Sequence, residues 1–164
     1  MSEKAQNINE YFESIDVTER LPKLAGRYRK TSSATFEYNC LAWALGANWA
    51  FFSPESKHLG YYWPPGVPRE WNLRNIRKIF NLHGYHDETN SRILETGFEK
   101  VAFYVDNEGE PSHFARQLES GKWTSKLGDL IDIEHDDLEC LECEDYGEVS
   151  LILKRPRSTK SDAR

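Results

Sequence analysis

The chain has 164 residues and a net charge of −6, with 38% hydrophobic and 29% charged residues. A chain of this length can bury a core without staples. We therefore expect a single domain over residues 1–155 and a disordered tail over 156–164. Eight acidic residues and no Lys or Arg lie between Glu134 and Glu148. Since the acidic chain carries no basic stripe, nucleic acid is excluded as the expected partner.

The cysteines and the apolar runs indicate the cellular setting. The chain has three cysteines, which cannot all pair, and its first residues lack the apolar segment of a secretory leader. The apolar runs fall short of the ~18 residues that a membrane helix needs. These features predict a cytoplasmic protein that makes no contact with a membrane.

The first half of the chain favours helices and irregular structure. We expect a short helix over residues 8–14, an irregular stretch over 20–37 and a helix over 40–47. An aromatic connection over 49–66 is interrupted by Pro and Gly, and an amphipathic helix over 70–82 follows it.

The second half favours strands. Runs of β-branched and aromatic residues between turn residues predict five of them, over residues 101–105, 112–118, 122–127, 131–134 and 149–153. The expected fold is therefore α+β, with a helix-rich N-terminal half packed on an antiparallel β-meander.

Cys40 stands where the helix over residues 40–47 is expected to begin. Asn39 is a good N-cap, so the thiol would lie in the first turn, close to unpaired backbone N–H groups and the positive end of the helix dipole. Both features favour the thiolate, which is the reactive form of cysteine. The alternative is that Cys40 is simply a small buried apolar residue.

His113 is the histidine best placed to work with such a thiol. It opens the strand over residues 112–118, where period-two alternation puts His113, Ala115 and Gln117 on one face. The small Ala115 would leave space beside the imidazole. The alternative is a structural histidine bonded to a loop carbonyl.

The third member of a catalytic set depends on strand register. A two-residue turn at Ser120 and Gly121 would put Lys126 on the face of His113, whereas a one-residue bulge would bring Ser125 there. Asp132 on the next strand has the right chemistry to orient an imidazole. We rank Asp132 first, Ser125 second and Asp129 third.

The oxyanion of an acyl-transfer reaction needs hydrogen-bond donors. The backbone N–H of Cys40 is the default donor, and the Asn39 or Tyr38 side chain would be a second. Cys140, Cys143 and His135 hint at zinc, but a structural zinc site normally needs four ligands. We therefore expect no metal and no organic cofactor.

The sequence Asn39-Cys40-Leu41-Ala42-Trp43, followed later by Ser112-His113 and several strands, resembles the papain-like cysteine hydrolases. NlpC-type and CHAP-type endopeptidases and amidases share this order of cysteine and histidine. Landmarks spread over residues 38–155, among them Tyr146-Gly147, also resemble an uncharacterised, mainly bacterial domain family. The first resemblance implies a papain-like, NlpC-like fold, and the second brings no established activity.

Together these features predict a cysteine hydrolase, either a thiol protease or an amidase, that acts on a peptide or another amide-containing substrate. Cys40 would attack the carbonyl and His113 would transfer the proton, with Trp43, Tyr62 and Trp63 lining the substrate groove. One alternative is a non-catalytic binding module that uses the aromatic connection as its contact surface. The other is a glutamine deamidase or acyl transferase.

Overall fold

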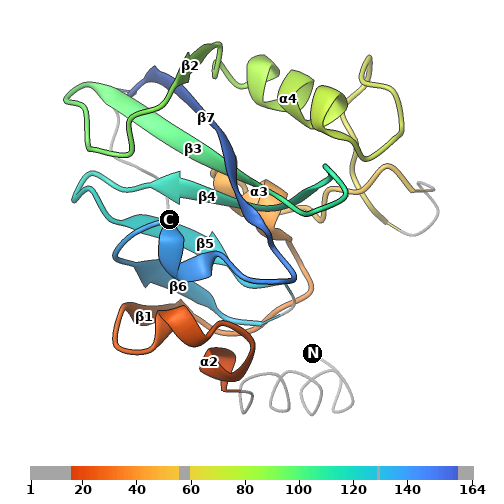
Figure 1. Ribbon diagram of the computed structural model, residues 1–164. Helices are drawn as coiled ribbons and strands as arrows, with labels where there is room; N and C mark the ends of the chain where they lie inside the picture. The colour runs from red at the N-terminus through yellow and green to blue at the C-terminus, as the bar shows by residue number, and fades with distance from the viewer. Residues whose placement is uncertain (1–15, 56–59, 129, 159–164) are drawn as a thin grey trace.

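The computed structural model of the protein describes residues 16–55, 60–128 and 130–158. One seven-stranded sheet dominates this part of the chain, in the order β1-β6-β5-β4-β3-β7-β2 (Figure 1). Every neighbouring pair of strands is antiparallel. The strands are β1 (Tyr28–Ser32), β2 (Asp87–Thr89), β3 (Phe98–Val105), β4 (Pro111–Gln117), β5 (Trp123–Lys126), β6 (Asp132–His135) and β7 (Glu148–Pro156).

The helices of the described residues are short. They are α2 (Val17–Arg20), α3 (Cys40–Ala44) and α4 (Leu73–Leu82), with 3₁₀ turns η1 (Pro22–Leu24) and η3 (Glu139–Leu141). None of these helices is long and apolar enough to cross a membrane. The expectation of a helix-rich N-terminal half on a β-meander, in a papain-like, NlpC-like arrangement, is therefore wrong.

The error has a physical cause in the N-terminal half. The segment Tyr28–Ser32, expected to be irregular, forms the edge strand β1 because its backbone pairs with β6. The helix expected over 40–47 ends at Ala44, and Gly46 follows it with a φ of +79°. The strand order is not a simple meander either, because β7 returns to lie between β3 and β2.

The five predicted strands of the second half and the amphipathic helix are confirmed. Helix α4 buries Ile76, Ile79 and Phe80, the apolar positions that recur at helical spacing. The short strand β2 and helix α2 were not predicted, and the helix expected over 8–14 lies outside the described residues.

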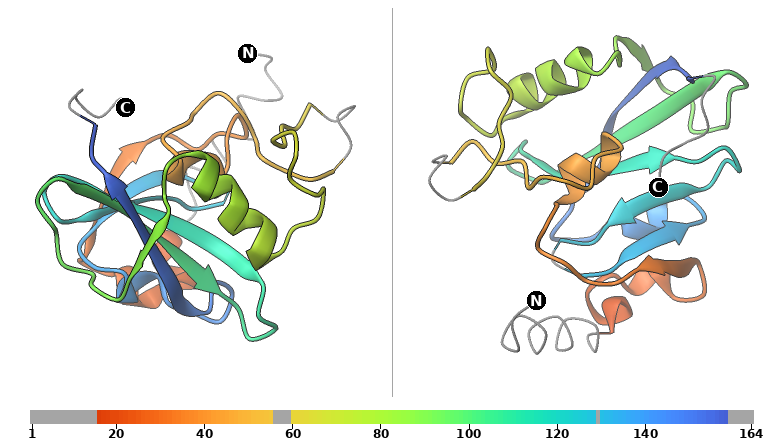
Figure 2. Two further views of the ribbon diagram at one scale, coloured as in Figure 1. Left: turned by 90° about the horizontal axis from the view of Figure 1, so that it is seen from above. Right: turned by 180° about the vertical axis from the view of Figure 1, so that it is seen from behind.

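The sheet has two covered faces, each with its own apolar cluster. On the first, here called the helix face, α3, α4 and the aromatic connection pack on alternate residues of β3, β4 and β7 (Figure 2). These strand residues are Val101, Phe103, Phe114, Leu151 and Leu153. On the opposite face, α2, η1 and η3 pack on Ala102, Tyr104, Ala115, Ile133 and Ile152.

The turn before β7, here called the Tyr146 turn (Cys143–Gly147), lies against the end of β3. Gly147 pairs with Cys143 across this turn and has a φ of +75°. A Cβ at Gly147 would lie 2.0 Å from the Val105 carbonyl oxygen, which is far inside van der Waals contact. Only glycine lets the two backbones approach this closely.

Gly147→Ala should therefore destabilise the protein much more than Gly26→Ala. Both glycines have a φ of +75°, but a Cβ at Gly26 would meet nothing within 4 Å. The shared backbone strain costs roughly 1 kcal/mol, and the clash at Gly147 adds about 1–3 kcal/mol. Urea denaturation of the two variants measures the difference, and equal losses would contradict the close approach.

Candidate functional site

Asn39 starts helix α3 and holds the segment that carries Cys40. The Asn39 side chain accepts a hydrogen bond from the Ala42 N–H at 3.2 Å, as an N-cap does. It also accepts from the Phe52 N–H at 3.2 Å and donates to the Phe52 carbonyl at 2.7 Å. Asn39 is buried and its amide is occupied on both sides. It is therefore not placed to donate to an oxyanion.

The Cys40 thiol is half-buried, with backbone donors around it. Burial raises its pKa to about 11, although hydrogen bonds from the backbone of Phe114, Leu41 and Cys40 itself favour the thiolate. Helix α3 has only five residues, so its dipole adds little to these bonds. The expected thiolate is therefore not the resting form, and the thiol is protonated at neutral pH.

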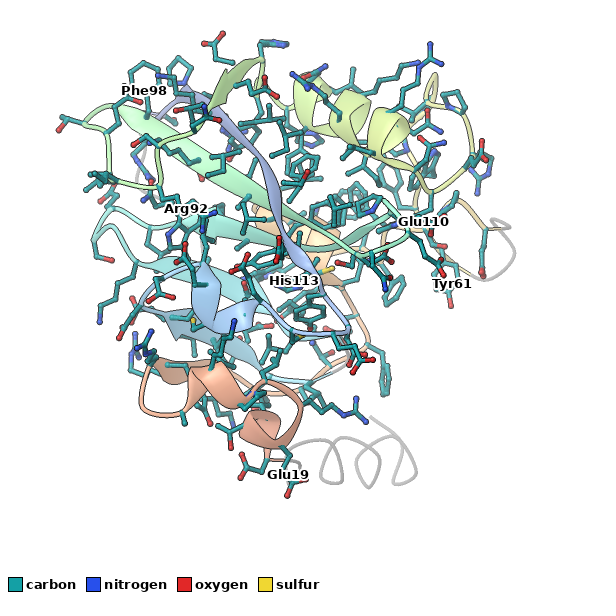
Figure 3. The ribbon with its side chains drawn as sticks, viewed as in Figure 1. Glu19, Tyr61, Arg92, Phe98, Glu110 and His113 are labelled. Carbon is teal, nitrogen blue, oxygen red and sulfur yellow. The ribbon has the colours of Figure 1, made fainter. Side chains whose placement is uncertain are left out.

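His113 is completely buried near the start of β4, and among the residues that the structure describes neither of its ring nitrogens has a hydrogen-bond partner. Figure 3 shows it in the middle of the molecule, away from the outline. Its ring stacks on Tyr146, with centroids 4.3 Å apart and planes 12° apart. Burial lowers the pKa of His113 to about 3, and the charge of His135 acts in the same direction. The imidazole is therefore neutral.

The register of β4 and β5 places the candidate orienting residues. Arg116 pairs with Thr124 and Gln117 with Trp123, one residue away from the register of a simple two-residue turn. Since paired residues share a face, Ser125 lies on the face of His113. Lys126 and its partner Asp132 lie on the helix face. The structure therefore does not bring Asp132 to His113.

Cys40 and His113 are both neighbours of Phe114, but no hydrogen bond joins their side chains. The backbone of Phe114, the residue after His113, lowers the pKa of the Cys40 thiol by hydrogen bonding, against the effect of burial. Cys40 packs against the apolar cluster of the helix face, whereas His113 contacts Tyr104 and Tyr146 of the opposite face. Burial raises the pKa of Tyr146, and the charge of a Cys40 thiolate would raise it further.

Asp132 is the centre of a second buried group of polar residues. Its Oδ2 accepts hydrogen bonds from the hydroxyls of Ser32 and Tyr38. Its Oδ1 lies 4.0 Å from the Lys126 ammonium, which donates to the Leu130 carbonyl at 2.5 Å. Burial raises the pKa of Asp132, while the bonds from Ser32 and Tyr38 oppose that change. This group links β1, β5 and β6 to the segment that leads into α3.

Ser125 has a partner other than His113. Its hydroxyl lies 2.8 Å from His135 Nε2, and His135 Nδ1 lies 2.9 Å from the Asp137 carbonyl. Cys140 Sγ is 3.7 Å from the same nitrogen. All three side chains, Ser125, His135 and Cys140, are buried, and burial lowers the pKa of His135 to about 4. Within the described residues, no three His, Cys, Asp or Glu side chains are grouped as a metal site.

The three residues expected to line the substrate groove, Trp43, Tyr62 and Trp63, each have different neighbours. Trp43 is half-buried, stacks on Tyr38 and donates to the Thr124 hydroxyl at 3.0 Å. Trp63 is buried and donates to the carbonyls of Val67 and Pro68, so it belongs to the core. Tyr62 packs edge-on against Trp49 and Phe52. Asp129 lies outside the described residues.

The sequence analysis did not predict that Lys126 and Tyr146 take part in the site. Lys126 was placed on the face of His113 by the assumed register, but its ammonium favours the Cys40 thiolate from the helix face. Tyr146 covers His113 from a turn, where no periodicity reports on side-chain position. Tyr146-Gly147 is nevertheless one of the landmarks of the uncharacterised family resemblance, and that was the available signal.

Comparison with known proteins gives one result. A family model described as a domain of unknown function (DUF7689) matches residues 29–154, and the chain therefore belongs to this family. The expected membership of an uncharacterised domain family is confirmed. No curated protein matches the chain, and no solved structure matches it.

Replacing the two buried histidines by leucine should have opposite effects. His113→Leu removes two unsatisfied buried nitrogens, so it should raise the free energy of unfolding by about 1–2 kcal/mol. His135→Leu leaves the Ser125 hydroxyl without its partner, so it should lower that energy by about 1–3 kcal/mol. Chemical denaturation at pH 7 measures both. A loss of stability in His113→Leu would contradict the absence of hydrogen bonds at that ring.

Acid should destabilise the protein as the pH falls from about 6.5 to 4. The pKa values of His113 and His135 are about 3 and 4 in the folded chain, below the ordinary 6.5. The unfolded chain therefore binds protons first, at about 1.4 kcal/mol per pH unit for each histidine. Unfolding free energies measured across this range should fall less steeply in His113→Leu. An unchanged slope in that variant would contradict the low pKa of His113.

Proposed function

We propose that the domain is a cysteine hydrolase in which Cys40 is the nucleophile and His113 the proton acceptor. The observation that carries the proposal is the completely buried His113 imidazole, which has no hydrogen-bond partner on either nitrogen. Leaving such a group unsatisfied costs about 1–3 kcal/mol. Buried groups of this kind call for a functional explanation. The Cys40 thiol provides one, because the backbone of Phe114, the residue after His113, lowers its pKa.

The chemistry would start from a neutral pair rather than from an ion pair. As the Cys40 sulfur attacks an amide or acyl carbonyl carbon, its proton passes to His113. The carbonyl oxygen becomes an oxyanion, which the Cys40 N–H would stabilise. His113 then returns the proton to the leaving amine, and water hydrolyses the thioester to regenerate the thiol. Because no hydrogen bond joins the two side chains, the thiol must first move into contact with the imidazole.

The orienting role in this proposal passes to Tyr146. Asp132 and Ser125 are engaged by other partners, whereas the Tyr146 ring stacks directly on His113. The Tyr146 turn is held in place because the Ser112 hydroxyl donates to the Tyr146 carbonyl. Peptides and other amides are the proposed substrate class, and a glutamine deamidase or an acyl transferase would use the same pair.

A non-catalytic binding module is the second candidate. The observation that favours it is the pKa of the thiol, about 11, together with a neutral imidazole that does not contact it. The aromatic connection supplies a surface for such a module, because Trp49 is 67% exposed and packs edge-on against Tyr62. The two candidates differ in whether Cys40 forms a covalent intermediate.

The hydrolase predicts that p-nitrophenyl acetate acylates Cys40 at pH 7 and releases p-nitrophenolate. Intact-mass spectrometry should detect one acetyl group, lost in Cys40→Ala. His113→Leu should slow acylation by about 10²–10⁴-fold, the usual contribution of a positioned base, while remaining folded.

Cys143→Ser is the matched control, because Cys143 is also half-buried and a serine can accept the hydrogen bond that the Tyr146 N–H donates to Cys143 Sγ at 3.3 Å. Its acylation should equal that of the wild type. If release does not exceed the rate in buffer, and iodoacetamide labels Cys40 no faster than Cys143, the hydrolase proposal fails and the binding module remains.

A further inference from the structure

A groove of about 650 Å³ opens on the helix face, over the end of the sheet formed by β1, β6 and β5. The apolar cluster of this face contains no residue of these three strands. In the described part of the chain, α3 packs over β4 and β5, and β1 and β6 extend beyond it (Figure 2). The volume is typical of a small-molecule site. The groove is lined by Arg29, Thr31, Ser32, Tyr38, Trp43, Asn48, Leu118, Thr124 and Glu134.

The hydroxyl protons of the groove floor point into the protein. The hydroxyls of Ser32 and Tyr38 both donate to Asp132, which is completely buried. The Thr124 hydroxyl donates to the Ile133 carbonyl at 3.0 Å. A hydroxyl has one proton and two lone pairs. Of these three residues only Ser32 is partly exposed, and with its proton committed inward its oxygen can only accept a hydrogen bond from a ligand. The Thr124 oxygen already accepts from the Trp43 indole N–H at 3.0 Å.

The charge of the groove is balanced. Arg29 donates to Glu134 through Nε at 3.2 Å and Nη2 at 3.1 Å, and both bonds go to Oε2. The other carboxylate oxygen of Glu134 receives neither bond and is a further acceptor. An ionic ligand would have to compete with this pair, so a neutral ligand is favoured. Trp43 and Leu118 add apolar surface beside these acceptors.

From this arrangement we infer that the groove binds a neutral saccharide. A sugar brings many O–H donors to the acceptors that the floor presents, carries no charge, and packs the C–H face of its ring on aromatic and aliphatic side chains. An apolar ligand would desolvate the Ser32 oxygen and the second carboxylate oxygen of Glu134 without offering either a hydrogen bond, which is costly. Binding in this groove does not require the chemistry of Cys40, so the inference is independent of the proposed hydrolase.

The test is calorimetric titration of the full chain with neutral oligosaccharides of glucose, xylose, galactose and N-acetylglucosamine. At least one of them should bind and raise the melting temperature of the wild type. Ser32→Ala and Glu134→Ala should each weaken that binding about five- to tenfold, as expected for one lost hydrogen bond. Glu88→Ala is the matched control, because Glu88 also pairs with an arginine, Arg77, but lies outside the groove.

Three results would overturn the inference. In the first, no member of the panel binds the folded wild type. In the second, a member binds but Glu134→Ala leaves its affinity unchanged. In the third, Glu88→Ala weakens binding as much as Glu134→Ala does. Should Ser32→Ala fail to fold, because it also removes a bond to Asp132, Glu134→Ala decides the outcome.

Discussion

The buried carboxyl group of Asp132, beside the buried ammonium of Lys126, is the contact that joins several parts of this fold. Neither side chain has any exposed surface, and their charged atoms lie 4.0 Å apart. A buried charge without a partner is strongly destabilising. The same carboxylate accepts from Ser32 on β1 and from Tyr38, which precedes α3. The Asp132 carboxyl group thus ties Tyr38, which precedes α3 and lines the groove, to β1 and β6.

Burial also disfavours the charged forms of the candidate catalytic pair, Cys40 and His113. Burial raises the pKa of the Cys40 thiol and lowers that of the His113 imidazole, so both resting forms are neutral. His135 on the same face is equally buried, but it has partners at both ring nitrogens. His135 therefore has a structural role, whereas the retention of His113 requires a functional reason.

Individual strands, the helix over residues 70–82 and the N-cap at Asn39 could be read from local pattern. The architecture could not, because a polar segment such as Tyr28–Ser32 becomes a strand only when β6 offers it a partner. The prediction of the site depended on the register between β4 and β5, which the sequence did not fix. A shift of one residue between β4 and β5 moves Lys126 off the face of His113 and brings Ser125 onto it.

By itself the sequence determined that alternate residues of each strand face opposite sides of the sheet, because this period of two follows directly from backbone geometry. It also determined that Cys40 begins a helix, since Asn39 caps it through bonds within three residues. Only the tertiary structure decided what meets the thiol and the imidazole: the backbone of β4, the Tyr146 ring, and no shared hydrogen bond. These contacts join segments far apart in the chain, so their energies depend on packing that no local pattern records.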